Sequence, residues 1–162
     1  MKRVTQEPDH VVEYKSTAYE QMIVRLRQES TLPKSCLIII AAPSPAQTQV
    51  IARELAARLG KMLHQVETSL LTSKYIGETE KSLNRLLDQA SSSGWVLFFD
   101  EADALFGKRT EVKDSHDRYA NQETSYLIEK LDKQRGIVIM GCRNSKAILR
   151  KLGKIRKLVV KL

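Results

Sequence analysis

The acidic pair Asp100 and Glu101 directly follows an apolar run, WVLFF, at residues 95–99. Such a pair can serve phosphate chemistry, because one carboxylate can hold a Mg²⁺ ion while the other polarises a water molecule for attack. An isolated Asp-Glu pair is usually part of a solvated loop. The preceding run favours the chemical interpretation, since ligands of open α/β sheets bind outside the carboxyl ends of buried strands.

The hydrophobic pattern indicates which elements would position these carboxylates. Short apolar runs predict strands buried on both faces at residues 37–40, 95–99 and 137–140, with weaker strands near 64–67 and 157–162. Helical spacing predicts helices over residues 19–27, 46–59, 80–91 and 116–133. Strands that alternate with helices predict an α/β domain with a parallel five-stranded sheet.

Several motifs resemble those of AAA ATPases. FFDEAD at residues 98–103 looks like the Walker B motif, and SKYIGETEKSLNRLL at 73–87 resembles the segment between this family's second strand and second helix. The longer string over residues 98–132 is similar to a bacterial subgroup that includes ATPases of contractile injection systems. The resemblance implies a three-layer, P-loop NTPase-like core with helices on both faces and strand order 5-1-4-3-2, the strands being numbered along the chain.

The resemblance also implies roles for individual residues. Asp100 would hold Mg²⁺ beside ATP, Glu101 would activate the attacking water, and Asn144 in the string GCRN would be the sensor residue. Tyr75, Ile76 and Gly77 match a pore loop that grips substrate polypeptide in ring-shaped relatives.

Arg156 is the nearest candidate for the arginine that active relatives supply to a neighbouring subunit, and Arg150 is the second. Both stand in a stretch rich in cations, so a place in a basic surface is the more ordinary interpretation.

Residues 42–49, APSPAQTQ, take the place of the phosphate-binding Walker A loop and depart from its pattern. A working loop needs glycines whose N–H groups wrap the phosphates, a Lys, and a Ser or Thr that holds Mg²⁺. This segment has no glycine, and Thr48 and Gln49 occupy the Lys and Mg²⁺-ligand positions. We therefore expect the binding of ATP and Mg²⁺ to be very weak or absent.

The same segment has the pattern of an ordinary helix start. Ser44 can cap a helix, Pro45 suits the first helical position, and Gln47 completes a Ser-x-x-Gln capping box. We expect a tight turn that runs straight into a helix capped by Ser44, so that the helix fills the space of the phosphate cradle.

Charge is concentrated at the C-terminal end of the chain. Residues 143–162 contain eight Lys or Arg and no Asp or Glu, whereas residues 1–142 carry nineteen charges of each sign. Apolar residues lie between the cations, so part of the stretch should fold and present a basic patch. Solvation of the domain edge, an acidic partner surface and nucleic acid remain open as explanations, and the absence of aromatic side chains disfavours nucleic acid.

Composition excludes several classes of protein. Apolar residues make up 42% and charged residues 28%, the balance of a globular domain, and no apolar run approaches the length of a membrane span. The N-terminus shows no secretory pattern, so a cytoplasmic location is expected. Cys36 and Cys142 should be buried and not bonded to each other, because they would lie at opposite ends of neighbouring parallel strands.

The sequence predicts a lead-in segment and helix at residues 1–30 and an AAA-like core at 31–162 that lacks the family's helical lid. The function that fits best is a non-hydrolysing pseudo-ATPase that works through protein contacts, with homologous AAA subunits among its partners. An active AAA ATPase that remodels protein complexes and a basic nucleic-acid-binding module are the alternatives.

Overall fold

The computed structural model describes residues 10–28, 36–66, 76–106 and 125–162. Its strands are β1 (His10–Glu13), β2 (Cys36–Ala41), β3 (Leu63–Val66), β4 (Val96–Phe99), β5 (Ile137–Cys142) and β6 (Lys157–Lys161). Its helices are α1 (Thr17–Gln28), α2 (Pro45–Arg58), α3 (Ile76–Ser93), α4 (Asp103–Phe106), a helix over residues 125–133, and α6 (Ser145–Leu152). The first part of the helix predicted over residues 116–133 falls outside the described residues.

The strands form one parallel sheet in the order β1-β6-β2-β5-β4-β3. The last five strands of this order confirm the expected 5-1-4-3-2 arrangement. The predicted number of five strands is wrong, because β1 adds a sixth strand beside β6. The four residues of β1, HVVE, include only two aliphatic side chains, too few to stand out as a buried strand.

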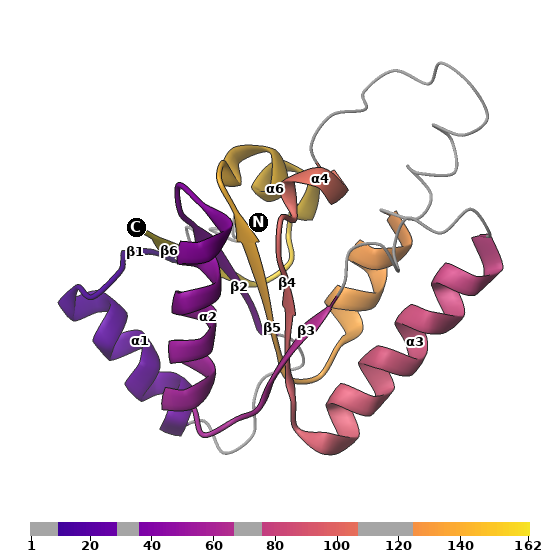
Figure 1. Ribbon diagram of the computed structural model, residues 1–162, viewed down its shortest axis with the longest axis horizontal. Helices are drawn as coiled ribbons and strands as arrows, with labels where there is room; N and C mark the ends of the chain where they lie inside the picture. Colours follow the sequence, from indigo (N-terminus) through magenta and orange to yellow (C-terminus); the bar gives the residue numbers. More distant parts are fainter. Residues whose placement is uncertain (1–9, 29–35, 67–75, 107–124) are drawn as a thin grey trace, which may run out of the picture.

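Helices cover both faces of the sheet and give the three layers that were expected (Figure 1). On the buried strands, alternate side chains enter two separate apolar cores, as the two-residue period of a strand requires. In β2, for example, Ile38 and Ile40 pack with α1 and α2, whereas Leu37 and Ile39 pack on the face that α3 and α6 cover.

The two cysteines lie at opposite ends of paired strands, as predicted. Cys36 is level with Ile137 at the start of β2 and β5, and Cys142 is level with Ala41 at their ends. Five residue steps along a parallel strand span about 16 Å, far beyond disulfide reach. Both thiols are buried, and neither forms a disulfide.

None of the described helices is both long enough and apolar enough to cross a membrane.

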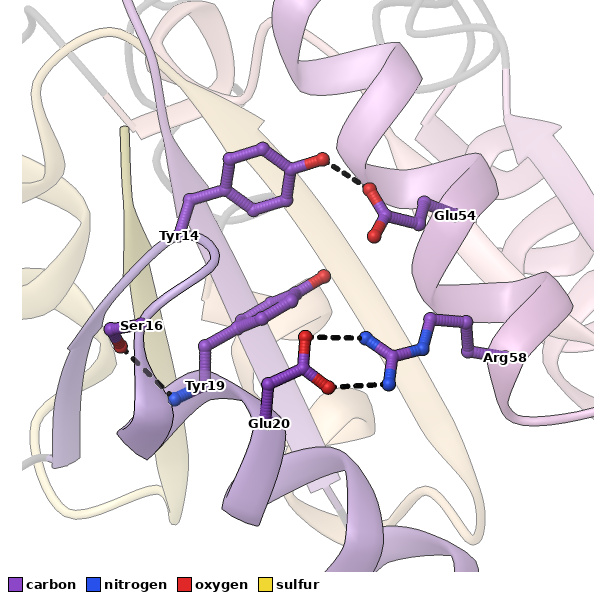
Figure 2. A network of polar contacts seen from close by, with 6 residues as sticks. All are labelled: Tyr14, Ser16, Tyr19, Glu20, Glu54 and Arg58. Atoms are coloured by element: carbon purple, nitrogen blue, oxygen red, sulfur yellow. Dashed lines mark hydrogen bonds and ion pairs between the residues drawn. The ribbon is translucent and has the colours of Figure 1, made fainter.

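The segment that contains β1 and α1 forms side-chain hydrogen bonds and an ion pair with α2. The Tyr14 hydroxyl donates to a carboxylate oxygen of Glu54, and the guanidinium of Arg58 donates to both carboxylate oxygens of Glu20, at 2.9 and 2.5 Å (Figure 2). Tyr19 is fully buried between them, and its ring meets that of Tyr14 edge to face. The helix α2 is thus held at Glu54 and Arg58 by the segment of β1 and α1. Whether residues 1–30 form a unit separate from the core stays a prediction.

Tyr14 and Tyr19 should respond differently to loss of the hydroxyl group. The hydrogen bond to Glu54 raises the pKa of Tyr14 to about 12, whereas the buried hydroxyl of Tyr19 has no partner among the described groups. Tyr14→Phe should therefore lower the free energy of unfolding by roughly 0.5–1.5 kcal/mol, and Tyr19→Phe should leave it unchanged or raise it. Urea unfolding at neutral pH measures both.

The pH dependence checks the same contact. Because folding raises the pKa of Tyr14 from 10.0, its stabilisation is present below pH 10 and is lost as the pH rises towards 12. The stability difference between wild type and Tyr14→Phe should shrink across that window. A stability difference between wild type and Tyr14→Phe that stays constant from pH 10 to pH 12 would contradict the assigned hydrogen bond.

Candidate functional site

Asp100 is the first residue after β4 and lies at the carboxyl edge of the sheet, where the sequence predicted it. Its side chain is 9% exposed and faces the first turns of α2. Thr48 Oγ1 lies 3.0 Å from Asp100 Oδ1, and Gln49 Nε2 donates to Oδ2 at 3.2 Å. The backbone N–H of Glu101 also donates to Oδ1, at 2.8 Å. Both carboxylate oxygens are therefore engaged by neutral donors from the protein itself.

Thr48 links the carboxylate to the start of α2. Its hydroxyl lies 2.9 Å from the carbonyl oxygen of Pro45 and 3.0 Å from Asp100 Oδ1, so one proton serves two acceptors. The side chain is buried, at 2% exposed. Thr48, which was predicted to take the Walker A Lys position, thus contributes a short, neutral side chain that bonds inward.

Gly141, in β5, allows Thr48 and Asp100 to meet. A Cβ atom at this position would lie 2.9 Å from Thr48 Cβ, closer than real Cβ atoms approach other atoms, and 3.0 Å from both Thr48 Oγ1 and Asp100 Oδ1, which is tighter than most real Cβ contacts. Only a residue without a side chain fits between β5 and the Thr48–Asp100 contact. Gly141 is the first residue of the string GCRN, and nothing in that string predicts a contact with Thr48.

The turn before α2 confirms the predicted helix start. Ser44 is the N-cap, Pro45 is the first helical residue, and Ser44 Oγ accepts from the N–H of Gln47 at 3.4 Å. In a capping box, the Gln47 side chain would accept from the backbone N–H of Ser44. Here the Gln47 amide oxygen accepts from the Ser44 hydroxyl instead, at 3.0 Å. The N–H groups of Gln47 and Thr48 also point to the Ser44 carbonyl oxygen, both at 3.2 Å. These N–H groups are thus used inside the helix.

A pocket of about 200 Å³ lies beside this cluster. Its lining includes Ser44, Pro45 and Thr48, the acidic residues Asp100, Glu101 and Asp103, and Arg143, which follows β5. The volume is below the roughly 300–1,000 Å³ typical of small-molecule sites. Among the residues that the structure describes, no three His, Cys, Asp or Glu side chains are grouped so that they could hold a metal ion.

Glu101, the predicted activator of water, is exposed at this pocket and adopts a left-handed backbone conformation, with φ of 52°. This conformation is uncommon for a residue with a side chain, and such residues cluster at functional sites. The geometry places the carboxylate at the pocket, while its catalytic role stays a prediction.

Asp103 was missed as a contributor to the site, although it is the last residue of the FFDEAD string. It starts α4, and its Oδ2 accepts from the N–H of Arg143 at 2.8 Å, which ties α4 to the end of β5. Its Oδ1 is buried without a partner among the described groups. Burial, and the nearby charge of Asp103, raise the pKa of the Cys142 thiol to about 12, so this cysteine stays protonated near neutral pH.

Other predicted site residues lie apart from the pocket. Asn144 caps α6, where its Oδ1 accepts from the N–H of Lys146 at 3.0 Å, and it is not among the described residues that line the pocket. Arg156 is exposed just before β6, at the end of the strands opposite Asp100. Tyr75 falls outside the described residues, and Ile76 and Gly77 open α3. Their sensor, trans-arginine and pore-loop roles all stay predictions.

Comparison with known proteins agrees with the fold. The model of the ATPase family associated with various cellular activities (AAA) matches residues 48–160. Residues 42–47, the first part of the segment predicted to take the place of Walker A, lie outside that match.

Three relatives illustrate the similarity. Spastin of Xenopus laevis is 31% identical over 69% of this chain and 19% of its own length. The Probable 26S proteasome regulatory subunit 10B of Caenorhabditis elegans is 31% identical over 63% of the chain and 25% of its own length, and the Ribosome biogenesis ATPase RIX7 of Saccharomyces cerevisiae is 29% identical over 66% and 13%.

The chain thus spans a quarter or less of the length of these relatives. All three are eukaryotic proteins, and the resemblance to the bacterial subgroup stays a prediction. The family match covers most of the sheet, including the strand β4 that precedes Asp100. This chain belongs to the AAA family of ATPases.

Proposed function

We propose that this chain is a non-hydrolysing AAA module that acts through contacts with other proteins. The observation that carries the proposal is the closed hydrogen-bond set around Asp100. Thr48 and Gln49, at the Lys and Mg²⁺-ligand positions of Walker A, bond to the very carboxylate that would serve Mg²⁺ in an active relative. The protein therefore satisfies this carboxylate without a nucleotide.

The residues that line the pocket do not fit a nucleoside triphosphate. Phosphates need a cradle of free N–H groups and a cation. Here Pro45 has no N–H group, and those of Gln47 and Thr48 point to the Ser44 carbonyl. Three acidic side chains line the pocket against one arginine, so its charge would repel phosphate.

ATP hydrolysis is the second candidate function, and one observation favours it. Glu101 stands exposed at the pocket in a strained backbone conformation, as a residue that activates water would. A chain that hydrolyses ATP would need phosphate-binding groups from a neighbouring subunit. Loss of turnover in Glu101→Gln would support this second candidate.

Rebuilding the loop tests the proposal. Residues 42–49 would be replaced by a full Gly-x-x-x-x-Gly-Lys-Thr sequence, with Thr48→Lys alone as the matched control. Nucleotide binding and phosphate release would be measured for wild type and both variants. We expect no activity in wild type or Thr48→Lys, because the cradle glycines are missing from both, and binding only in the rebuilt loop. Turnover by the wild-type chain would overturn the proposal.

Other AAA subunits are the partners that we propose first, and the cytoplasm is the proposed location. Family membership supports the choice of partner, since AAA proteins typically assemble with one another or contact other proteins. Light scattering after size-exclusion chromatography, with the chain alone and mixed with an active AAA subunit from the same cell, would measure such assembly. Elution as two unassociated species at micromolar concentrations would contradict it.

A further inference from the structure

The helix α6 and its flanks present a row of exposed cations. We call Arg143, Lys146, Arg150, Lys151 and Lys154 the α6 basic surface, and all five side chains are exposed. No Asp or Glu occurs from residue 143 to residue 162. No ion pair joins any of the five to a described residue.

Three of the eight C-terminal cations, Arg156, Lys157 and Lys161, are not part of this surface, and Lys157 among them is buried. Lys157 is 6% exposed, and its ammonium group donates to the carbonyl oxygens of Gly153 and Ile155, at 2.7 and 3.2 Å. The expectation that all eight C-terminal cations form the patch is therefore wrong for Lys157. Its charge is used to hold the turn between α6 and β6.

The helix that carries these cations is packed into the core. Ile148 and Leu152 anchor α6 in the core, at 0% and 2% exposed. At 100° per residue, Lys146 and Arg150 fall on one face of the helix, about 40° apart, and Lys151 projects from the side, about 100° round the axis from Arg150. The eight residues of α6 span about 12 Å, so several like charges are fixed within a short distance.

The arrangement favours an anionic partner. Arg143 and Lys146 stand at the N-terminal end of α6, where the helix dipole repels cations and attracts anions. The first turn holds no acidic residue to offset this repulsion. An anion placed along α6 would meet both the side-chain charges and the positive end of the helix.

We propose that the α6 basic surface docks an acidic segment of a partner protein. The inference rests on the proposed function, in which the chain works through protein contacts, and it names the chemistry of the partner. The charged track is short, because Arg143 lines the pocket together with Glu101 and Asp103, whose carboxylates would repel a polyanion extended in that direction. A short acidic peptide matches the length of the α6 basic surface, whereas a nucleic-acid backbone would need a longer row of cations. No aromatic side chain is present from residue 143 to residue 162 to stack on bases.

Fluorescence anisotropy with a labelled poly-glutamate peptide of about twenty residues tests the inference at low ionic strength, where electrostatic contacts are least screened. The test variant combines Lys146→Glu, Arg150→Glu and Lys151→Glu. The matched control makes the same charge change at exposed arginines on α1, α2 and α3, with Arg27→Glu, Arg53→Glu and Arg85→Glu. Circular dichroism melts of both variants verify that they fold.

We expect the wild-type chain to bind the peptide, the α6 variant to bind at least about tenfold more weakly, and the control to stay within about threefold of wild type. Equal loss in the two folded variants, or no binding by wild type, would overturn the inference. Duplex DNA, single-stranded DNA and RNA of equal charge form the second arm, and tighter binding of any of them would also overturn it. None of these results depends on ATP, so a failure here is distinguishable from a failure of the proposed function.

Discussion

Replacing Asp100 by alanine is expected to lower the free energy of unfolding by roughly 1–3 kcal/mol with no nucleotide present. The buried carboxylate accepts from the Gln49 amide and the Glu101 N–H, and it shares the proton of the Thr48 hydroxyl. Alanine would leave these donors without their acceptor. In this account, Asp100 is a structural acceptor that joins β4 to α2.

Urea unfolding followed by the fluorescence of Trp95 measures this effect. Asp88→Ala, at an exposed carboxylate on α3, is the matched control and should change stability by less than about 0.5 kcal/mol. Asp100→Asn should lose less than Asp100→Ala, because the amide keeps one acceptor oxygen in place. An Asp100→Ala variant as stable as wild type would show that the hydrogen-bond set contributes nothing.

Gly141→Ala is expected to destabilise the protein by roughly 1–3 kcal/mol, the usual cost of overpacking a core. The added methyl group would collide with Thr48 Cβ and Asp100 Oδ1, and it would push α2 away from the sheet. The loss should therefore come from this contact and not from the general properties of the β5 backbone.

A double-mutant cycle separates these two causes. Thr48→Gly removes the Cβ that the new methyl group would strike, whereas Thr48→Ala keeps it. The penalty for Gly141→Ala should shrink most in the Thr48→Gly background and less in Thr48→Ala, which removes only the Oγ1 contact at 3.0 Å, as measured by urea unfolding. Equal penalties in all three backgrounds would locate the strain elsewhere.

The elements that were predicted most accurately from the sequence are those that a local residue pattern specifies. The runs that form β2, β4 and β5 are apolar on both faces, and such runs belong to the interior of a parallel sheet, so their placement was confirmed. The start of α2 was predicted because Ser44 and Pro45 act within a single turn of the chain.

Features set by contacts between distant residues could not be predicted in this way. The Tyr14–Glu54 bond joins residues 40 apart, and the Gly141 contact joins β5 to α2, so neither leaves a local pattern. Lys157 was counted as a surface charge because nothing in its neighbours shows that its ammonium group reaches the carbonyls of Gly153 and Ile155.

In the proposed function, the start of α2 takes the place of the phosphate cradle, and Thr48 and Gln49 bond to Asp100, the carboxylate predicted to hold Mg²⁺ in an active relative. Titration calorimetry of the purified chain with Mg-ATP and with Mg-ADP tests this claim most directly, with the rebuilt Gly-x-x-x-x-Gly-Lys-Thr loop as the positive control. We expect no heat of binding from wild type at nucleotide concentrations up to about 1 mM, and saturable binding from the rebuilt loop. Micromolar binding of Mg-ATP by the wild-type chain would contradict the account.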